Sequence, residues 1–198
     1  ANPNEIVINT VERAMTLDEA VAAGLVASKD AATDEEKALY SGQPWDNQFF
    51  LIANRDLEVG DEVYVSFKYM ATAPATVGTQ NSRDAGNYLH WAGLGNIEFT
   101  TDWQTFETTV TIPKETAFDD QGNPKGPQNS WTFNLSNAKA ANEFHIKNII
   151  FCNAEKTHSL IDMVNPSDDN FKKKIGANTA AFPARLDEPD AIKNATVK

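Results

Sequence analysis

A chain of 198 residues is long enough to bury one sizeable core, and 41% apolar with 10% aromatic residues excludes a largely disordered protein. A formal net charge of -11 argues against nucleic acid and anionic membranes as partners, because phosphate-binding surfaces need clustered lysine and arginine. The single cysteine, Cys152, excludes an intrachain disulfide and is expected to be a small buried residue behind the apolar run NIIF. No stretch is apolar over a membrane-spanning length, so membrane insertion is not expected.

The first forty residues predict one strand followed by short helical elements. EIVINTV (5–11) alternates apolar and polar residues and predicts a strand. The pattern Thr16-Leu-Asp-Glu19 is a capping box, and the apolar residues after it continue at helical spacing to Leu25. The pattern Thr33-Asp-Glu-Glu36 repeats this signal before SGQP breaks the chain. A short helical insertion is therefore expected near the N-terminus.

From Trp45 onward the sequence predicts one strand after another. In 62–71 the alternation is nearly perfect and places one face in the core: Val63, Val65, Phe67 and Tyr69. Residues 72–79, rich in proline, glycine and threonine, are expected to form a loop, as is 119–129. The other expected strands are 47–54, 87–91, 96–100, 105–112, 130–136 and 143–151. About eight closely spaced strands with little helix predict an all-β fold, an antiparallel β-sandwich of the jelly-roll kind.

The domain division follows from where this periodicity stops. We expect one β-sandwich domain over residues 1–153, with its core in 45–151. Residues 154–198 are rich in proline, aspartate, lysine and alanine, and we expect a linker, an extension or a piece of a neighbouring domain.

Catalytic chemistry finds little support in the sequence. Glycan hydrolysis needs a pair of carboxylates close together. The acids within the expected strands are instead single and scattered: Glu62, Glu98, Glu107 and Glu143. There is no G-x-S-x-G motif, and the three histidines lie in dissimilar contexts. The polar loops at 119–123 and 165–170 could supply oxygen ligands for calcium, although an ordinary polar loop is the favoured interpretation. The chain is expected not to be an enzyme and to need no cofactor.

Binding is the chemistry that the residue types favour. The segment 80–103 gathers aromatic, amide, histidine and arginine side chains, and a neutral sugar offers a C–H face for aromatic rings and hydroxyls for polar groups. Trp45, in the loop before a strand, is expected to be exposed and to contact ligand. Trp103, Trp131 and Phe133 are expected to pack in the core or at strand ends.

Five sequence blocks together resemble the jelly-roll carbohydrate-binding modules of bacterial xylanases, above all those attached to or inserted in family 10 endoxylanases of gut bacteria. The resemblance spans residues 45–151. The blocks are PWDNQFFLIAN, GDEVYVSFKYMA, TQ with GNYLHW, FTTDWQTFETTVTIP and WTFNLSNAKAANEFHIKNIIF.

This resemblance implies a sandwich that binds one xylan chain or xylo-oligosaccharide in a cleft on its concave sheet, without catalysis. It also implies a monomer outside the cell or at the bacterial surface, linked to a xylanase that it targets to polysaccharide. Mixed-linkage glucan, mannan or a protein partner remain alternatives. The residues expected to bind the ligand are Trp45, Gln48, Gln80, Arg83, Tyr88, His90, Trp91 and Asn134. The structural calcium of the family is in doubt, because Asn148 stands where an acidic pair is common.

Overall fold

The computed structural model describes residues 5–83, 89, 93–114, 118, 121–160 and 195–197. The helices in this part of the chain are α1 (Leu17–Ala22) and α2 (Asp34–Leu39). Neither is long and apolar enough to cross a membrane. The strands are β1 (Glu5–Asn9), β2 (Gln48–Leu57), β3 (Glu62–Ala71), β4 (Ala75–Ser82), β5 (Asn96–Phe99), β6 (Gln104–Thr111), β7 (Gln128–Asn134), β8 (Glu143–Asn153) and β9 (Ala195–Val197).

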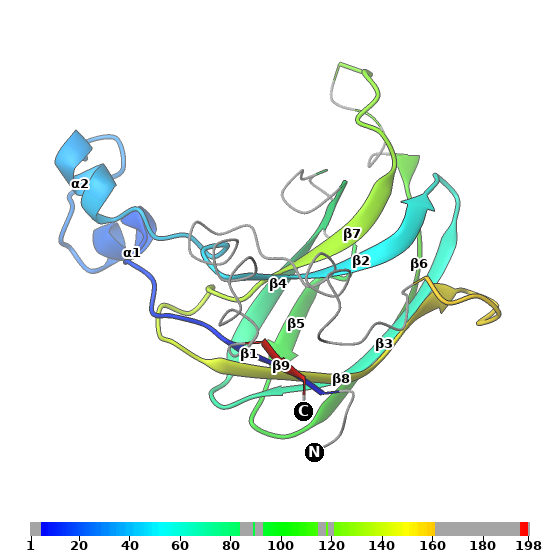
Figure 1. The fold of residues 1–198 in the computed structure, drawn as a ribbon. Helices are drawn as coiled ribbons and strands as arrows, with labels where there is room; N and C mark the ends of the chain where they lie inside the picture. Colours follow the sequence, from blue (N-terminus) through cyan, green and yellow to red (C-terminus); the bar gives the residue numbers. More distant parts are fainter. Residues whose placement is uncertain are drawn as a thin grey trace.

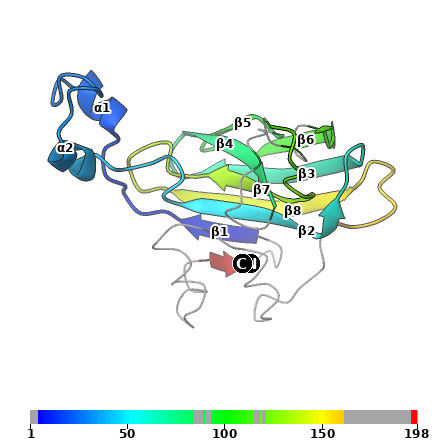
Figure 2. The same ribbon diagram turned by 90° about the horizontal axis from the view of Figure 1, so that it is seen from above.

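The strands form two antiparallel sheets that face each other. One sheet has the order β6-β3-β8-β1-β9 and the other the order β2-β7-β4-β5. Figure 1 shows the sheets as two layers, and Figures 1 and 2 both place α1 and α2 beyond one end of the strands. Most neighbouring strands are not consecutive in the chain, as in a jelly roll. The predicted β-sandwich with a short helical insertion is thus confirmed.

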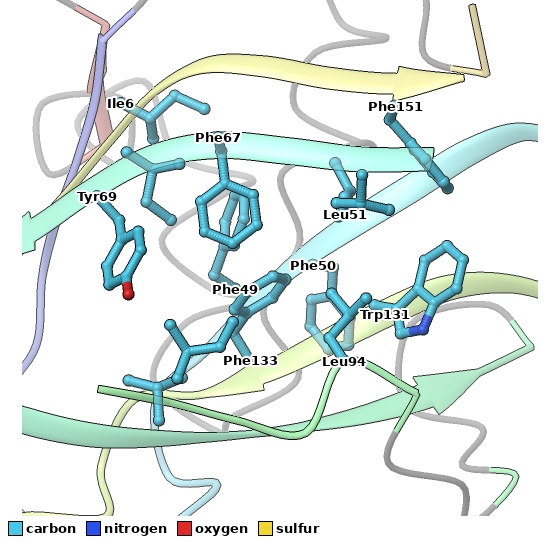
Figure 3. Close-up of a cluster of buried hydrophobic side chains, with 14 of the residues drawn as sticks. Ile6, Phe49, Phe50, Leu51, Phe67, Tyr69, Leu94, Trp131, Phe133 and Phe151 are labelled. Atoms are coloured by element: carbon cyan, nitrogen blue, oxygen red, sulfur yellow. The ribbon is translucent and has the colours of Figure 1, made fainter. Parts of the chain in front are cut away.

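The core lies between the sheets and follows the predicted alternation. Val63, Val65, Phe67 and Tyr69 are all buried on the inner face of β3. The Phe67 ring meets the Phe133 ring of the opposite sheet, with centroids 5.8 Å apart. Figure 3 shows Phe67, Phe133 and their neighbours filling this space. Aromatic contacts across the two layers thereby fix how the sheets face each other.

The tryptophans that the structure describes divide between core and surface. Trp131 is fully buried against Phe151, at 5.1 Å between ring centroids, and the core prediction for it and for Phe133 is confirmed. Trp103 is 38% exposed, so it does not lie in the core. It packs at the start of β6, on the outer face of its sheet, with Lys147 Nζ 3.4 Å from its ring centroid. Cys152 on β8 is buried, as predicted, and its burial raises the pKa of the thiol.

Both predicted capping boxes are present, one at each helix. In α1 the Thr16 hydroxyl accepts from the Glu19 backbone N–H at 3.1 Å, and the Glu19 carboxylate accepts from the Thr16 N–H at 2.8 Å. The equivalent bonds at α2 join Thr33 and Glu36. The predicted short helix is confirmed, and it ends at Ala22, before Leu25, where Gly24 adopts a φ of 71°.

The prediction of a loop over 72–79 is also wrong, because β4 begins at Ala75. Ala75, Val77 and Thr79 are buried and alternate with half-buried positions, which is the pattern of a strand with one face inward. Pro74 stands just before the strand, where its missing N–H costs no ladder hydrogen bond. Gly78 pairs with residues on both neighbouring strands. The turn-forming composition therefore concealed a central strand.

The described part of the C-terminal region contributes to the sandwich at two points. Leu160 is buried in the core cluster, and its N–H donates to the Phe151 carbonyl at 2.7 Å. Strand β9 pairs antiparallel with β1 and extends the five-stranded sheet. The division of the chain into a module over 1–153 and an extension over 154–198 stays a prediction.

Candidate functional site

The four-stranded sheet turns one face to the core and carries mainly polar side chains on the other, where β2 also places Phe50 and Ile52 opposite Thr132 and Ser130. Phe49 and Phe133 lie on β2 and β7 with ring centroids 5.4 Å apart, and Phe133 also meets Phe67 of the other sheet. Because side chains alternate along a strand, Gln48 and Asn134 point to the opposite face. The strand register extends this face across three strands. We call its polar side chains the polar row: Gln48, Asn134, Thr132, Ser130, Gln80 and Ser82.

Two predicted binding residues form a pair at one end of the polar row. Gln48 and Asn134 are directly opposite each other on β2 and β7. The Gln48 Nε2 group donates to Asn134 Oδ1 at 2.8 Å. Gln48 is fully buried and Asn134 is 7% exposed. The structure therefore brings these two amides together and fixes the orientation of both.

Hydroxyl groups continue the polar row toward its other end. Ser82 and Thr132 share a hydrogen bond of 3.0 Å between their hydroxyls, and the Ser130 hydroxyl donates to the Ser82 carbonyl at 3.3 Å. All three side chains are fully buried. Gln80, opposite Thr132, is half-buried and supplies an accessible amide. The sequence analysis missed the three hydroxyls, although their alternation with Asn134 and Gln80 was a usable signal.

Arg83 lies just beyond the row and is exposed at the end of β4. Its side chain crosses directly over Gly126 in the segment before β7. A Cβ at Gly126 would stand 2.7 Å from Arg83 Nη1, and the φ of 87° at this glycine also disfavours any side chain. From Asn134 to Ser130 the row is about 14 Å long, since an antiparallel strand rises about 3.4 Å per residue. Arg83 thus marks the end opposite to the Gln48 and Asn134 pair.

Three of the predicted ligand-binding residues, Tyr88, His90 and Trp91, lie outside the described residues, and so does most of the strand expected over 87–91. Leu89 is described. It is buried, is not part of a strand, and donates its backbone N–H to the Asn81 carbonyl on β4 at 3.2 Å. The chain at Leu89 is therefore attached beside the strand that carries Gln80. The roles of Tyr88, His90 and Trp91 stay predictions.

Trp45 is exposed, as predicted, but the structure places it apart from the polar row. It is 49% exposed and stands three residues before β2, beside α1. There it lines a pocket of about 460 Å³ together with residues from α1 and from the segment after β7. Of the five predicted residues that the structure describes, Gln48, Gln80, Arg83 and Asn134 lie along or next to the row and Trp45 lines this pocket, and their roles in binding stay predictions.

Electrostatic effects concentrate beside this pocket. The Arg13 guanidinium donates Nη1 to Glu19 Oε2 at 2.7 Å and Nη2 to Glu19 Oε1. These hydrogen bonds lower the pKa of the Glu19 carboxyl from its usual 4.5 to about 2, and the same interaction raises the pKa of Arg13. Sequence reasoning missed this pair, although Glu19 was recognised as a capping residue. Both charges are therefore permanent near neutral pH.

The described acids of the first and last long strands are not arranged to hold the structural calcium that the resemblance implies. The acids on the first and last long strands, Glu5 and Glu143, each face His145, with Oε1 atoms 2.8 Å from its two ring nitrogens. Asn148 lies where β8 bulges and has a φ of 55°. Among the residues that the structure describes, no three histidine, cysteine or acidic side chains gather in a way that could hold a metal. The loop prediction at 165–170 lies outside the described residues, as do Asp119 and Asp120.

The acids considered for catalysis make ordinary surface contacts. Glu98 accepts from the Thr76 hydroxyl at 2.7 Å, and Glu107 from the Tyr64 hydroxyl at 2.7 Å. Glu98 and Glu107 are exposed, as is Glu62, and Glu143 is half-buried against His145. They belong to different strands and face different neighbours.

Solved structures similar to this chain include carbohydrate-binding modules (CBMs). A CBM of PbXyn10C in its apo form matches 80% of this chain and 72% of its own length, at 13% identity and a TM-score of 0.48. A structure described as CBM4 matches 54% of this chain and 72% of its own, at 14% identity and a TM-score of 0.42. The second N-terminal cellulose-binding domain of β-1,4-glucanase C from Cellulomonas fimi matches 54% and 65%, at 22% identity and a TM-score of 0.37.

No family model matches the sequence, and no curated protein does. The solved structures to which this chain is similar thus include the class of module that its sequence blocks resemble.

Proposed function

We propose that this chain is a non-catalytic carbohydrate-binding module that binds a β-glycan chain, xylan in the first place, along the polar row. The observation that carries the proposal is the row itself: amides and hydroxyls from β2, β7 and β4 share the sheet face turned away from the core. Such groups match the rim of hydroxyls on a neutral sugar. The acidic net charge agrees with a neutral ligand.

The polar row and the adjacent Arg83 provide two kinds of polar group: buried amides that bond to each other and side chains that reach solvent. Gln48 and Asn134 are buried and bonded to each other, so they keep the sheet face polar and rigid. Gln80 and Arg83 reach solvent and would donate to sugar hydroxyls. Tyr88 and Trp91 would supply the aromatic stacking, and His90 a further hydrogen bond. Each such contact contributes about 1 kcal/mol net in a wet site, so the expected affinity is modest.

We further propose the context that the resemblance implies. The module would be a monomer outside the cell or at the bacterial surface, linked to a xylanase catalytic domain that it holds on polysaccharide. Mixed-linkage glucan and mannan are the alternative ligands, because the twist of the bound chain selects the glycan through the spacing of contacts in space.

The test is isothermal titration of the full chain with xylohexaose, cellohexaose and mannohexaose. Gln80→Ala and Arg83→Ala should each weaken binding about five-fold, a loss of about 1 kcal/mol. Gln104→Ala and Arg55→Ala are matched controls, because both side chains are exposed and neither belongs to the row: Gln104 is on β6 of the other sheet, and Arg55 donates to Asp61. Binding that the first pair weakens and the controls do not would support the proposal. No heat with any of the three sugars would overturn the glycan function and favour a protein-binding sandwich.

A further inference from the structure

The pocket beside Trp45 has the size and lining of a small ligand site. Its volume of about 460 Å³ falls within the usual range of ligand pockets. Trp45 lines one side together with Gln43 of its own turn, and polar side chains from three other segments line the rest: Asp18, Lys29 and Asn137. Figures 1 and 2 show α1 lying at the end of the sandwich where β2 begins, which is where these segments meet.

The backbone around Trp45 is held firmly although its side chain is half exposed. Gln43 and Asp46 close a turn around it: the Asp46 N–H donates to the Gln43 carbonyl at 3.0 Å, and the Gln43 N–H to Asp46 Oδ2 at 3.0 Å. On either side, the Ser136 N–H donates to the Pro44 carbonyl and Asn47 is buried. An anchored turn therefore presents a large apolar ring to solvent at the edge of the pocket.

Arg13 lines the pocket, but its hydrogen bonds to protein groups leave it no donor for a ligand. Arg13 donates to the carbonyls of Ser136, Ala14 and Asn137 at 2.6 to 2.9 Å, besides its two bonds to Glu19. These bonds use every donor of the guanidinium. The side chain of Arg13 is only 1% exposed. It joins α1 to the segment after β7, and both of these line the pocket.

The groups that remain accessible suit a neutral polyol. The Lys29 and Asp18 side chains form an exposed ion pair of 2.6 Å, and they are 60% and 70% exposed. Asn137 is exposed and Gln43 half-buried. Hydrogen-bond donors and acceptors, both charged and neutral, thus lie around one flat aromatic ring. A sugar ring satisfies both requirements, since its C–H face stacks on an indole while its hydroxyls accept and donate.

We propose that this pocket binds one sugar unit of a neutral glycan, stacked on Trp45, as a second site separate from the polar row. It rests on the proposed function for the class of its ligand, but it uses none of the same side chains. Trp45 lies beyond the end of the row that Gln48 and Asn134 form, whereas Arg83 is at the other end. The helical insertion, which is not part of the sandwich, would thereby acquire a role in binding.

The test follows the indole N–H signal of Trp45 by two-dimensional NMR of the full chain, assigned by its loss in Trp45→Phe. Xylose, glucose, mannose and xylotriose are titrated against the wild type and against a Gln80→Ala, Arg83→Ala double variant. The Trp45 signal should move in both proteins and saturate with at least one sugar. In parallel calorimetry with xylohexaose, Trp45→Ala should weaken affinity about three-fold to ten-fold. Trp103→Ala, which removes another exposed tryptophan far from the pocket, should leave affinity unchanged.

The outcomes separate this proposal from the function of the row. A Trp45 signal that none of the sugars moves, in a protein that binds xylohexaose through Gln80 and Arg83, overturns the second site alone. A shift that persists when the row variants bind xylohexaose as well as the wild type supports the pocket and overturns the row. Equal losses in Trp45→Ala and Trp103→Ala would also count against the pocket, because they would show a general effect of removing a surface tryptophan.

Discussion

Arg13 and Glu19 join the helical insertion to the β-sandwich through a two-pronged ion pair, with one side chain buried and the other 39% exposed. Glu19 has two functions: it pairs with Arg13, and it completes the capping box of α1 by accepting from the Thr16 N–H. A single carboxylate therefore fixes both the start of the helix and its attachment to the end of β7.

We expect Arg13→Ala to lower the free energy of unfolding by about 2 to 4 kcal/mol, because it leaves buried carbonyls and the Glu19 carboxylate without their donors. Urea denaturation followed by circular dichroism measures the change. Arg55→Ala is the matched control: its partner Asp61 is at the surface, and such pairs contribute about 1 kcal/mol or less. Equal effects of the two substitutions would show that Arg13 does not join the insertion to the sandwich.

The pH dependence of this contact follows from the lowered pKa of Glu19. A carboxyl whose folded-state pKa is about 2 and whose usual pKa is 4.5 stabilises the fold above about pH 4.5 and loses that contribution as pH falls toward 2. We expect Glu19→Gln to be less stable than the wild type at pH 7 and the difference to shrink between pH 4.5 and 2. Urea midpoints of both proteins across this range test it. A difference that stays constant with pH would contradict the assignment.

Gly42 is required by a close approach of two backbone segments. A Cβ at this position would lie 1.8 Å from the Ala14 carbonyl oxygen, and the Gly42 N–H donates to the Met15 carbonyl. We expect Gly42→Ala to destabilise the protein by more than about 2 kcal/mol, as overpacking against backbone does. Gly78→Ala is the control, since its Cβ would meet only Asn96 Oδ1, at 3.6 Å. Thermal unfolding of the two variants should separate them clearly.

We expect the buried amides of Gln48 and Asn134 to be coupled in their effects on stability. Gln48→Ala and Asn134→Ala should each destabilise the protein by about 1 to 3 kcal/mol. Because the two side chains share a hydrogen bond of 2.8 Å, the double variant should lose about 1 kcal/mol less than the sum of the single variants. Urea denaturation of the four proteins measures this cycle. Strict additivity would mean that the hydrogen bond contributes nothing to stability.

The sequence alone was sufficient for the local features of this protein. Two capping boxes predicted two helix starts, and strict alternation in β3 predicted which side chains enter the core, because both signals depend on neighbours close in the chain. A strand such as β4, with proline before it and glycine within it, is stabilised by its partners on both sides, so its own composition misled the prediction.

Only the tertiary structure decided which of these residues meet. Arg13 reaches the Ser136 carbonyl across 123 positions of the chain, and no periodic pattern encodes such a contact. The same holds for Trp45, which stands three residues before Gln48 and yet lines a pocket with residues of α1. Sequence spacing fixes the direction of a side chain along its own strand, whereas the packing of distant segments determines what that side chain faces.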